Sequence, residues 1–119
     1  MRTYLLIALT LAVAAVHAET FACDLKALTP EQRKLHQKLS HDLGSAVTGR
    51  RELPDGYTFR IDSAKMPVVD IAQWITFEHR CCPFVVFRLE VQRDEIVSLS
   101  LQGAAGVKKF IETEFRLSE

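Results

Sequence analysis

Alternating apolar and polar residues predict three strands in the second half of the chain. From Tyr57 to Ile61 every second residue is apolar, which is typical of a half-buried strand. The same alternation recurs over residues 84–92 and 96–102, and the polar run Arg93-Asp94-Glu95 separates these two stretches. We therefore expect a β-hairpin beside one further strand.

A helix is predicted before the first of these strands. Leucine recurs every four residues at positions 35, 39 and 43, which gives one apolar stripe on a helix. Thr29 and Gln32 have the spacing of a capping box at its start. We expect the helix to end at Gly44, or to continue weakly towards Arg51, before a turn at residues 53–56.

Two more helices follow from the same spacing. One begins near Pro67 and ends before Pro83, because proline cannot continue a helix. The last begins after residues 103–106, and its apolar face is Val107, Phe110, Ile111 and Phe115.

These elements predict an α+β fold with the order α-β-α-β-β-α. About three helices would cover one face of a small three-stranded sheet, an arrangement like half of a ferredoxin-like fold. Our preferred order places the strand at 96–102 between the other two, and the alternative order gives a mixed sheet.

The first eighteen residues are typical of a secretory signal peptide. Arg2 precedes an apolar stretch from Leu5 to Val16, and Val16-His17-Ala18 ends in the small residue expected before a cleavage site. The apolar stretch is too short to span a bilayer, which takes about 20 residues. We therefore expect a periplasmic or secreted protein, not held in a membrane after cleavage, with a single α+β domain at residues 19–119.

Charge provides no sign of a polyanionic partner. Residues 19–119 contain 14 basic and 15 acidic residues, a formal net charge of −1. This balance argues against binding to nucleic acid or to an anionic membrane. It gives no information about the oligomeric state.

Reactive side chains are concentrated where the second helix is predicted to end. Glu78, His79, Arg80, Cys81 and Cys82 are consecutive. Adjacent helical residues point about 100° apart, so Cys81 and Cys82 cannot both face the core and one should be reachable. Glu78 lies one turn before both, at neighbour spacing. These three residues are the candidates for catalysis.

An ordinary structural role is the first alternative. An oxidising compartment favours disulfides, and Cys23 could pair with either Cys81 or Cys82 and leave one spare thiol. On this interpretation the chain is a structural or interaction domain. His36 and His41 would be solvated residues on a polar helix.

A soft-metal site is the second interpretation and the one we favour. Cys23, Cys81 and Cys82 together would supply three sulfurs, with His79 as a further ligand. Thiolates select soft ions such as mercury, copper(I), zinc or arsenite-like species. The partner would then be a soft metal ion or a thiol-reactive small molecule.

A thiol-based enzyme is the third interpretation. A pair of thiols can bind the mercury of an organomercurial, and Glu78 can donate the proton that releases the carbon group, as in an organomercurial lyase. A disulfide between Cys81 and Cys82 could instead act as a redox switch.

Several motifs resemble a small uncharacterised bacterial family. They are Phe21-Ala22-Cys23-Asp24-Leu25, Glu52-Leu53-Pro54-Asp55-Gly56-Tyr57 and, most specifically, the run Arg80-Cys81-Cys82-Pro83-Phe84. Family members often lack a signal peptide and occur beside heavy-metal resistance functions. The resemblance therefore implies a soft-metal role for the three cysteines.

Overall fold

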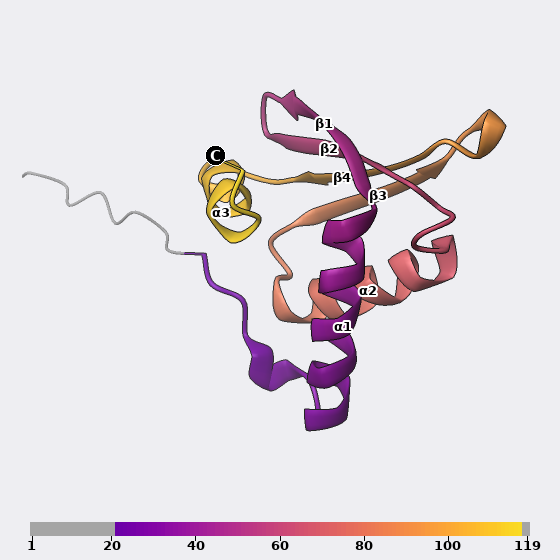
Figure 1. The fold of residues 1–119 in the computed structure, drawn as a ribbon. Coiled ribbons are helices and arrows are strands. Elements are labelled where there is room, and N and C mark those ends of the chain that lie inside the picture. The colour runs from indigo at the N-terminus through magenta and orange to yellow at the C-terminus, as the bar shows by residue number, and fades with distance from the viewer. Residues whose placement is uncertain (1–20, 118–119) are drawn as a thin grey trace, which may run out of the picture.

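The computed structural model describes residues 21–117 of the chain, so the predicted signal peptide at residues 1–18 lies outside the described part. Figure 1 shows the arrangement of the helices and strands. The elements, in chain order, are η1 (Leu25–Ala27), α1 (Pro30–Ala46), β1 (Val47–Leu53), β2 (Gly56–Ile61), α2 (Val68–Cys81), β3 (Val86–Val91), η2 (Arg93–Glu95), β4 (Val97–Gln102) and α3 (Val107–Glu114).

The α+β class is confirmed, but the sheet has four strands where three were predicted. All its neighbours are antiparallel, in the order β1-β2-β4-β3. The predicted hairpin of β3 and β4 is present, and β4 lies between β2 and β3 as preferred. Because both flanking strands run antiparallel to β4, β2 and β3 are parallel to each other and α2 connects them.

The additional strand, β1, replaces the predicted weak continuation of the first helix. Its sequence has no apolar alternation, and the residues between its two ends are all exposed. An edge strand of this kind is held by main-chain pairing with β2 and needs no buried side chains of its own. The predicted order α-β-α-β-β-α is therefore wrong by one strand.

The turn between β1 and β2 was predicted correctly. Leu53 pairs with Gly56, so Pro54 and Asp55 form a two-residue loop. A Cβ atom at Gly56 would collide with the main chain of Leu101 on β4, which explains why a residue without a side chain is needed there.

The first helix begins as predicted. Thr29 Oγ1 accepts a hydrogen bond from the Gln32 amide at 3.2 Å, and the Gln32 side chain accepts one from the Thr29 amide at 3.0 Å. The helix continues past Gly44 to Ala46. Its buried residues, Leu39, Leu43 and Ala46, face the core.

Trp74 on α2 joins the helices to the sheet. Its side chain is 1% exposed, and its indole N–H donates a hydrogen bond to Ser40 Oγ on α1 at 3.1 Å. The ring meets Phe87 on β3 edge-on, with centroids 5.9 Å apart, and Phe115 after α3 at 6.1 Å. Removing this side chain would therefore open a cavity between α1, β3 and the residue that follows α3.

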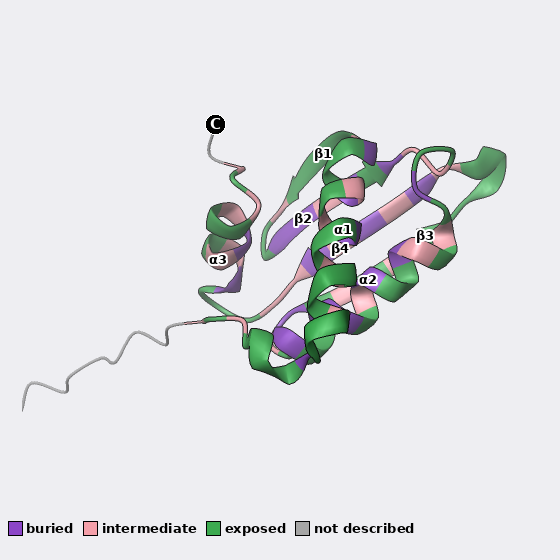
Figure 2. Cartoon of the chain, turned by 60° about the horizontal axis from the view of Figure 1, so that its bottom comes forward, coloured by how far each residue is buried: buried purple, intermediate pink, exposed green. Residues whose placement is uncertain are grey.

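The two faces of the sheet differ sharply in burial. Alternate residues of β2 and β4 are buried. Figure 2 shows α1 and α2 lying over one face of the sheet. Residues of the opposite set, including Thr58, Arg60, Ser98 and Ser100, face away from the core. Val91, at the end of β3, is 57% exposed. No helix among the described residues is long and apolar enough to cross a membrane.

Candidate thiol and metal site

The N-terminal segment folds back onto the end of α2. The Asp24 amide donates a hydrogen bond to the Cys81 carbonyl at 3.0 Å, and Leu28 is buried, with 3% exposed. Cys23 is joined to Cys82 in a disulfide, with the two Cα atoms 4.7 Å apart. The structure therefore brings the lone cysteine of the N-terminal segment to the pair that follows in the sequence 59 residues later.

Both members of the cysteine pair are buried, so the expectation that one would be reachable is wrong. Cys81 is 2% exposed and Cys82 is fully buried. The two residues do not both have helical geometry, because α2 ends at Cys81 and Cys82 has φ −126° and ψ 68°. This change in the backbone turns the second side chain inwards, where the N-terminal segment covers it.

Glu78 places a carboxylate against the disulfide. The residue is 8% exposed, although it is an acidic residue on a helix. Its Oε1 atom lies 3.6 Å from Cys82 Sγ. Because a disulfide sulfur carries no proton, this distance is a packing contact here, and it would become a weak hydrogen bond from an S–H group after reduction.

His36 on α1 is the partner of this carboxylate. Its Nε2 atom lies 2.5 Å from Glu78 Oε2, and the two side chains are 15% and 10% exposed. The expectation that His36 would be solvated is wrong. Its position three residues before Leu39 and seven before Leu43 places it on the buried stripe of α1, and this spacing could have identified it. His41 is exposed, as expected.

Cys81 is a free, buried thiol. Burial raises its pKa, and the nearby carboxylates of Glu78 and Asp24 raise it further, while Arg80 opposes them weakly. A raised pKa disfavours the thiolate, which is the form that attacks electrophiles and binds metals. The surroundings of Cys81 therefore disfavour the reactive, metal-binding form of this thiol.

His79, the further ligand considered from sequence, is not brought to the sulfurs. The residue is exposed, and its ring meets Phe87 edge-on with centroids 6.3 Å apart. The atoms that do converge are the sulfurs of Cys23 and Cys82 and a carboxylate oxygen of Glu78, all within 4.8 Å of one another. The clustered set thus contains two of the three proposed cysteines, and Glu78 takes the place expected for Cys81.

A pocket of about 400 Å³ opens beside these groups. Four polar or sulfur-bearing residues of the site line it: Cys23, His36, Glu78 and Cys81. Apolar side chains provide much of the remaining wall, among them Phe21, Leu25 and Phe110. The pocket therefore reaches the half-buried Cys23, while Cys82 is fully buried.

Comparison with known proteins adds no relative. No family model, no curated protein and no solved structure matches the chain. The resemblance to the family with the Arg-Cys-Cys-Pro-Phe motif therefore stays a prediction from sequence.

Proposed function

We propose that this chain is an exported domain that binds a soft metal ion through Cys23, Cys82 and Glu78 when its disulfide is reduced. The disulfide form is then the closed state of the site. Export itself follows from the signal peptide predicted at residues 1–18, and the metal role agrees with the sequence resemblance described above.

The observation that supports this proposal most strongly is the buried carboxylate of Glu78. A disulfide that only crosslinks the chain needs no acid beside it, and burying a carboxylate is costly unless it is paired. Here the acid touches one sulfur and is paired with His36. The two sulfurs and this carboxylate are therefore a set of donor atoms suited to a cation, which a simple crosslink would not need.

Opening the site requires a reductant of the dithiol class. A dithiol reduces the Cys23–Cys82 bond by two electrons, so that two thiols form here and one disulfide forms in the reductant. Metal binding then releases the thiol protons, and Glu78 is positioned to accept the proton from Cys82. The two sulfurs must then separate, and about 3.5–4 Å between them suits shared coordination at Zn–S lengths near 2.3 Å.

The donor set favours mercury(II) or copper(I). Two thiolates satisfy these soft ions, and a carboxylate adds a weak third contact. Zinc prefers four ligands, and an arsenite-like species would require Cys81 as its third sulfur. A variant at Cys81 therefore separates the first pair of ions from arsenite.

The test is thiol counting with and without metal. The reduced chain should lose two titratable thiols when one equivalent of mercury(II) is added, and ultraviolet absorption from sulfur-to-mercury charge transfer should appear. Cys82→Ser should abolish both signals. The matched variant Cys81→Ser should retain them, because its sulfur lies outside the clustered atoms.

Two results would refute the proposal. One is a reduced chain whose thiols remain fully titratable with mercury present. The other is an equal loss of binding in both serine variants. Either outcome would favour the alternative of a structural or interaction domain with one disulfide and the spare thiol Cys81.

The pocket favours a second candidate, cleavage of an organomercurial. Its apolar walls beside Cys23 could hold an organic group while the reduced sulfurs bind the mercury. The proton taken by Glu78 from the Cys82 thiol would then pass to the carbon, so that the carbon–mercury bond breaks and the hydrocarbon leaves. Two sulfur–mercury bonds replace the carbon–mercury bond and the bond from mercury to its counter-ligand, which leaves with the proton of the Cys23 thiol.

Phenylmercury provides the test of this activity. The reduced chain should release benzene, and Glu78→Gln should still bind mercury(II) but release none. A parent protein that releases no benzene excludes the lyase and leaves the metal-binding proposal intact, because binding is measured separately.

A further inference from the structure

The open face of the sheet is rich in arginine. Along one row across the strands, Arg51 on β1 pairs with Thr58 on β2, which pairs with Ser100 on β4. In the neighbouring row, Gly49 pairs with Arg60, which pairs with Ser98. Side chains on one face of a sheet recur at every second residue, so these two rows present their side chains on the same side.

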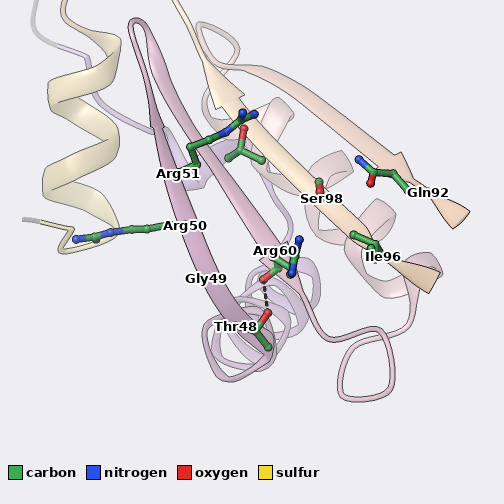
Figure 3. A pocket seen from close by; sticks show the side chains of 9 residues that line it. Thr48, Gly49, Arg50, Arg51, Arg60, Gln92, Ile96 and Ser98 are labelled. Carbon is green, nitrogen blue, oxygen red and sulfur yellow. Dashed lines mark hydrogen bonds between the residues drawn. The ribbon is translucent and has the colours of Figure 1, made fainter. Parts of the chain in front are cut away.

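A hollow of about 590 Å³ lies over these rows (Figure 3). Its lining residues come from β1, β2, β4 and the two ends of the β3–β4 connection. None of them is acidic: Thr48, Gly49, Arg50, Arg51, Thr58, Arg60, Gln92, Ile96 and Ser98. Two cations on this face, Arg51 and Arg60, and several hydrogen-bonding groups therefore lie around one space.

The cations of this hollow have no carboxylate partners in the described part of the chain. The ion pairs found among residues 21–117 involve only lysines and histidines as bases. Glu90 is on the same face but pairs with Ser98, two strands away from Arg60, which is roughly 9–10 Å. In a chain with equal numbers of acidic and basic residues, this is a local concentration of positive charge.

The arrangement of Arg51 and Arg60 suits one ligand with two anionic groups. They are diagonal neighbours across the β1–β2 pair, a relation that places Cβ atoms about 7–8 Å apart. Figure 3 shows the side chain of Arg50 directed away from both. Gly49 leaves the space opposite Arg60 open, since no atom lies within 4 Å of where its Cβ would be.

We propose that this hollow binds a small soluble polyanion, such as a diphosphate or a polycarboxylate, held by the guanidinium groups of Arg51 and Arg60. Each guanidinium can donate two parallel hydrogen bonds to a phosphate or carboxylate group. Thr58, paired with Arg51, and Ser98, paired with Arg60, add hydroxyl groups to the lining.

Charge complementarity favours this occupant over an apolar partner or a sheet partner. The hollow is on the face of the sheet, so a bound strand would gain no main-chain pairing there. Aromatic side chains, on which nucleic-acid bases stack, are absent from its lining in the described part of the chain.

The test uses inorganic pyrophosphate and citrate with the full chain, measured by NMR titration. Pyrophosphate or citrate should shift the amide signals of residues 48–51, 58–60 and 98. Arg51→Ala and Arg60→Ala should each weaken binding about tenfold, because each removes a charged hydrogen-bonding group. Arg51→Lys should weaken it less.

Two further variants test whether binding depends only on the total charge of the chain, and whether it needs the open space at Gly49. Arg33→Ala removes the same charge from the exposed side of α1 and should leave the affinity unchanged. Gly49→Val adds a side chain to this space, where a Cβ atom meets nothing within 4 Å, and should prevent binding while the sheet stays folded.

Four results would overturn the proposal. They are no binding of either anion, an equal loss in Arg33→Ala and Arg51→Ala, undiminished binding in Gly49→Val, and binding only to vesicles that contain phosphatidylglycerol.

Discussion

The end of α2 and the open face of the sheet handle charge in opposite ways. At the end of α2, Glu78 is buried, paired with His36 and in contact with a sulfur. On the open face, Arg51 and Arg60 are exposed and have no carboxylate partner in the described part of the chain. The first region is closed by its own covalent bond, while the second is open to a ligand as it stands.

From this difference we expect the end of α2 to contribute to stability and the open face of the sheet to contribute to ligand binding. Removing one partner of a buried polar pair lowers the free energy of unfolding, because the other group is left buried without its hydrogen bond. Exposed arginines contribute little to stability but remain available to an anion. Substitutions in the two regions should therefore separate stability from binding.

Breaking the disulfide should produce the largest effect. Cys23→Ser with Cys82→Ser removes a crosslink across 59 residues, and the chain-entropy estimate for such a loop is about 4 kcal/mol. The free energy of unfolding, measured by urea denaturation, should fall by about that amount. Cys81→Ala is the matched control and should cost about 1 kcal/mol or less. Equal losses would contradict a crosslinking role for the bonded pair.

Removing the partner of the buried acid should have the next largest effect. His36→Ala leaves Glu78 buried without its hydrogen bond, which should destabilise the domain by about 1–3 kcal/mol. His41→Ala, on the exposed side of the same helix, should leave stability within about 0.5 kcal/mol. Urea denaturation measures both, and an unaffected His36 variant would show that the pair is unimportant in solution.

The buried thiol should give a smaller, pH-dependent effect. Since the pKa of Cys81 is raised in the folded chain, its contribution to stability is complete below the ordinary thiol pKa and is lost as the pH rises through the folded value. Stability should therefore decline more steeply at alkaline pH in the parent than in Cys81→Ala. Alkylation by iodoacetamide should also be slow near neutral pH and accelerate as the pH rises. Fast alkylation near neutral pH would contradict the raised pKa.

Substitution on the open face should have the smallest effect on stability. Arg60→Gln should change the free energy of unfolding by no more than about 0.5 kcal/mol, because the side chain is exposed and unpaired in the described part. The same variant should weaken pyrophosphate binding clearly. A large loss of stability would show that this face supports the fold and is not primarily a binding surface.

Most of the fold could be predicted from apolar periodicity. The three helices, β2 and the β3–β4 hairpin were found because each has one buried side, and the capping box at Thr29 is an explicit local signal. The strand β1 could not be found in this way, because only its main chain is paired and its side chains are largely exposed. Apolar periodicity indicates which side chains are buried, but it gives no information about main-chain pairing at an edge strand.

The candidate site was predicted only in part. The concentration of reactive groups at the end of α2 was visible, and Cys23 was the obvious partner from elsewhere in the chain. The chain turn at Cys82 and the approach of His36 to Glu78 depend on how α1 packs on α2, which local sequence does not encode. For this reason Glu78 and His36, not Cys81 and His79, surround the bonded sulfurs.

X-ray absorption spectroscopy of the reduced chain loaded with one equivalent of mercury(II) tests the metal proposal most directly. The account predicts two sulfur neighbours and a light-atom neighbour that disappears in Glu78→Ala, with the same spectrum in Cys81→Ser. A third sulfur neighbour that is lost in Cys81→Ser, or a spectrum unchanged by Glu78→Ala, would contradict the assignment of Cys23, Cys82 and Glu78 as the ligands.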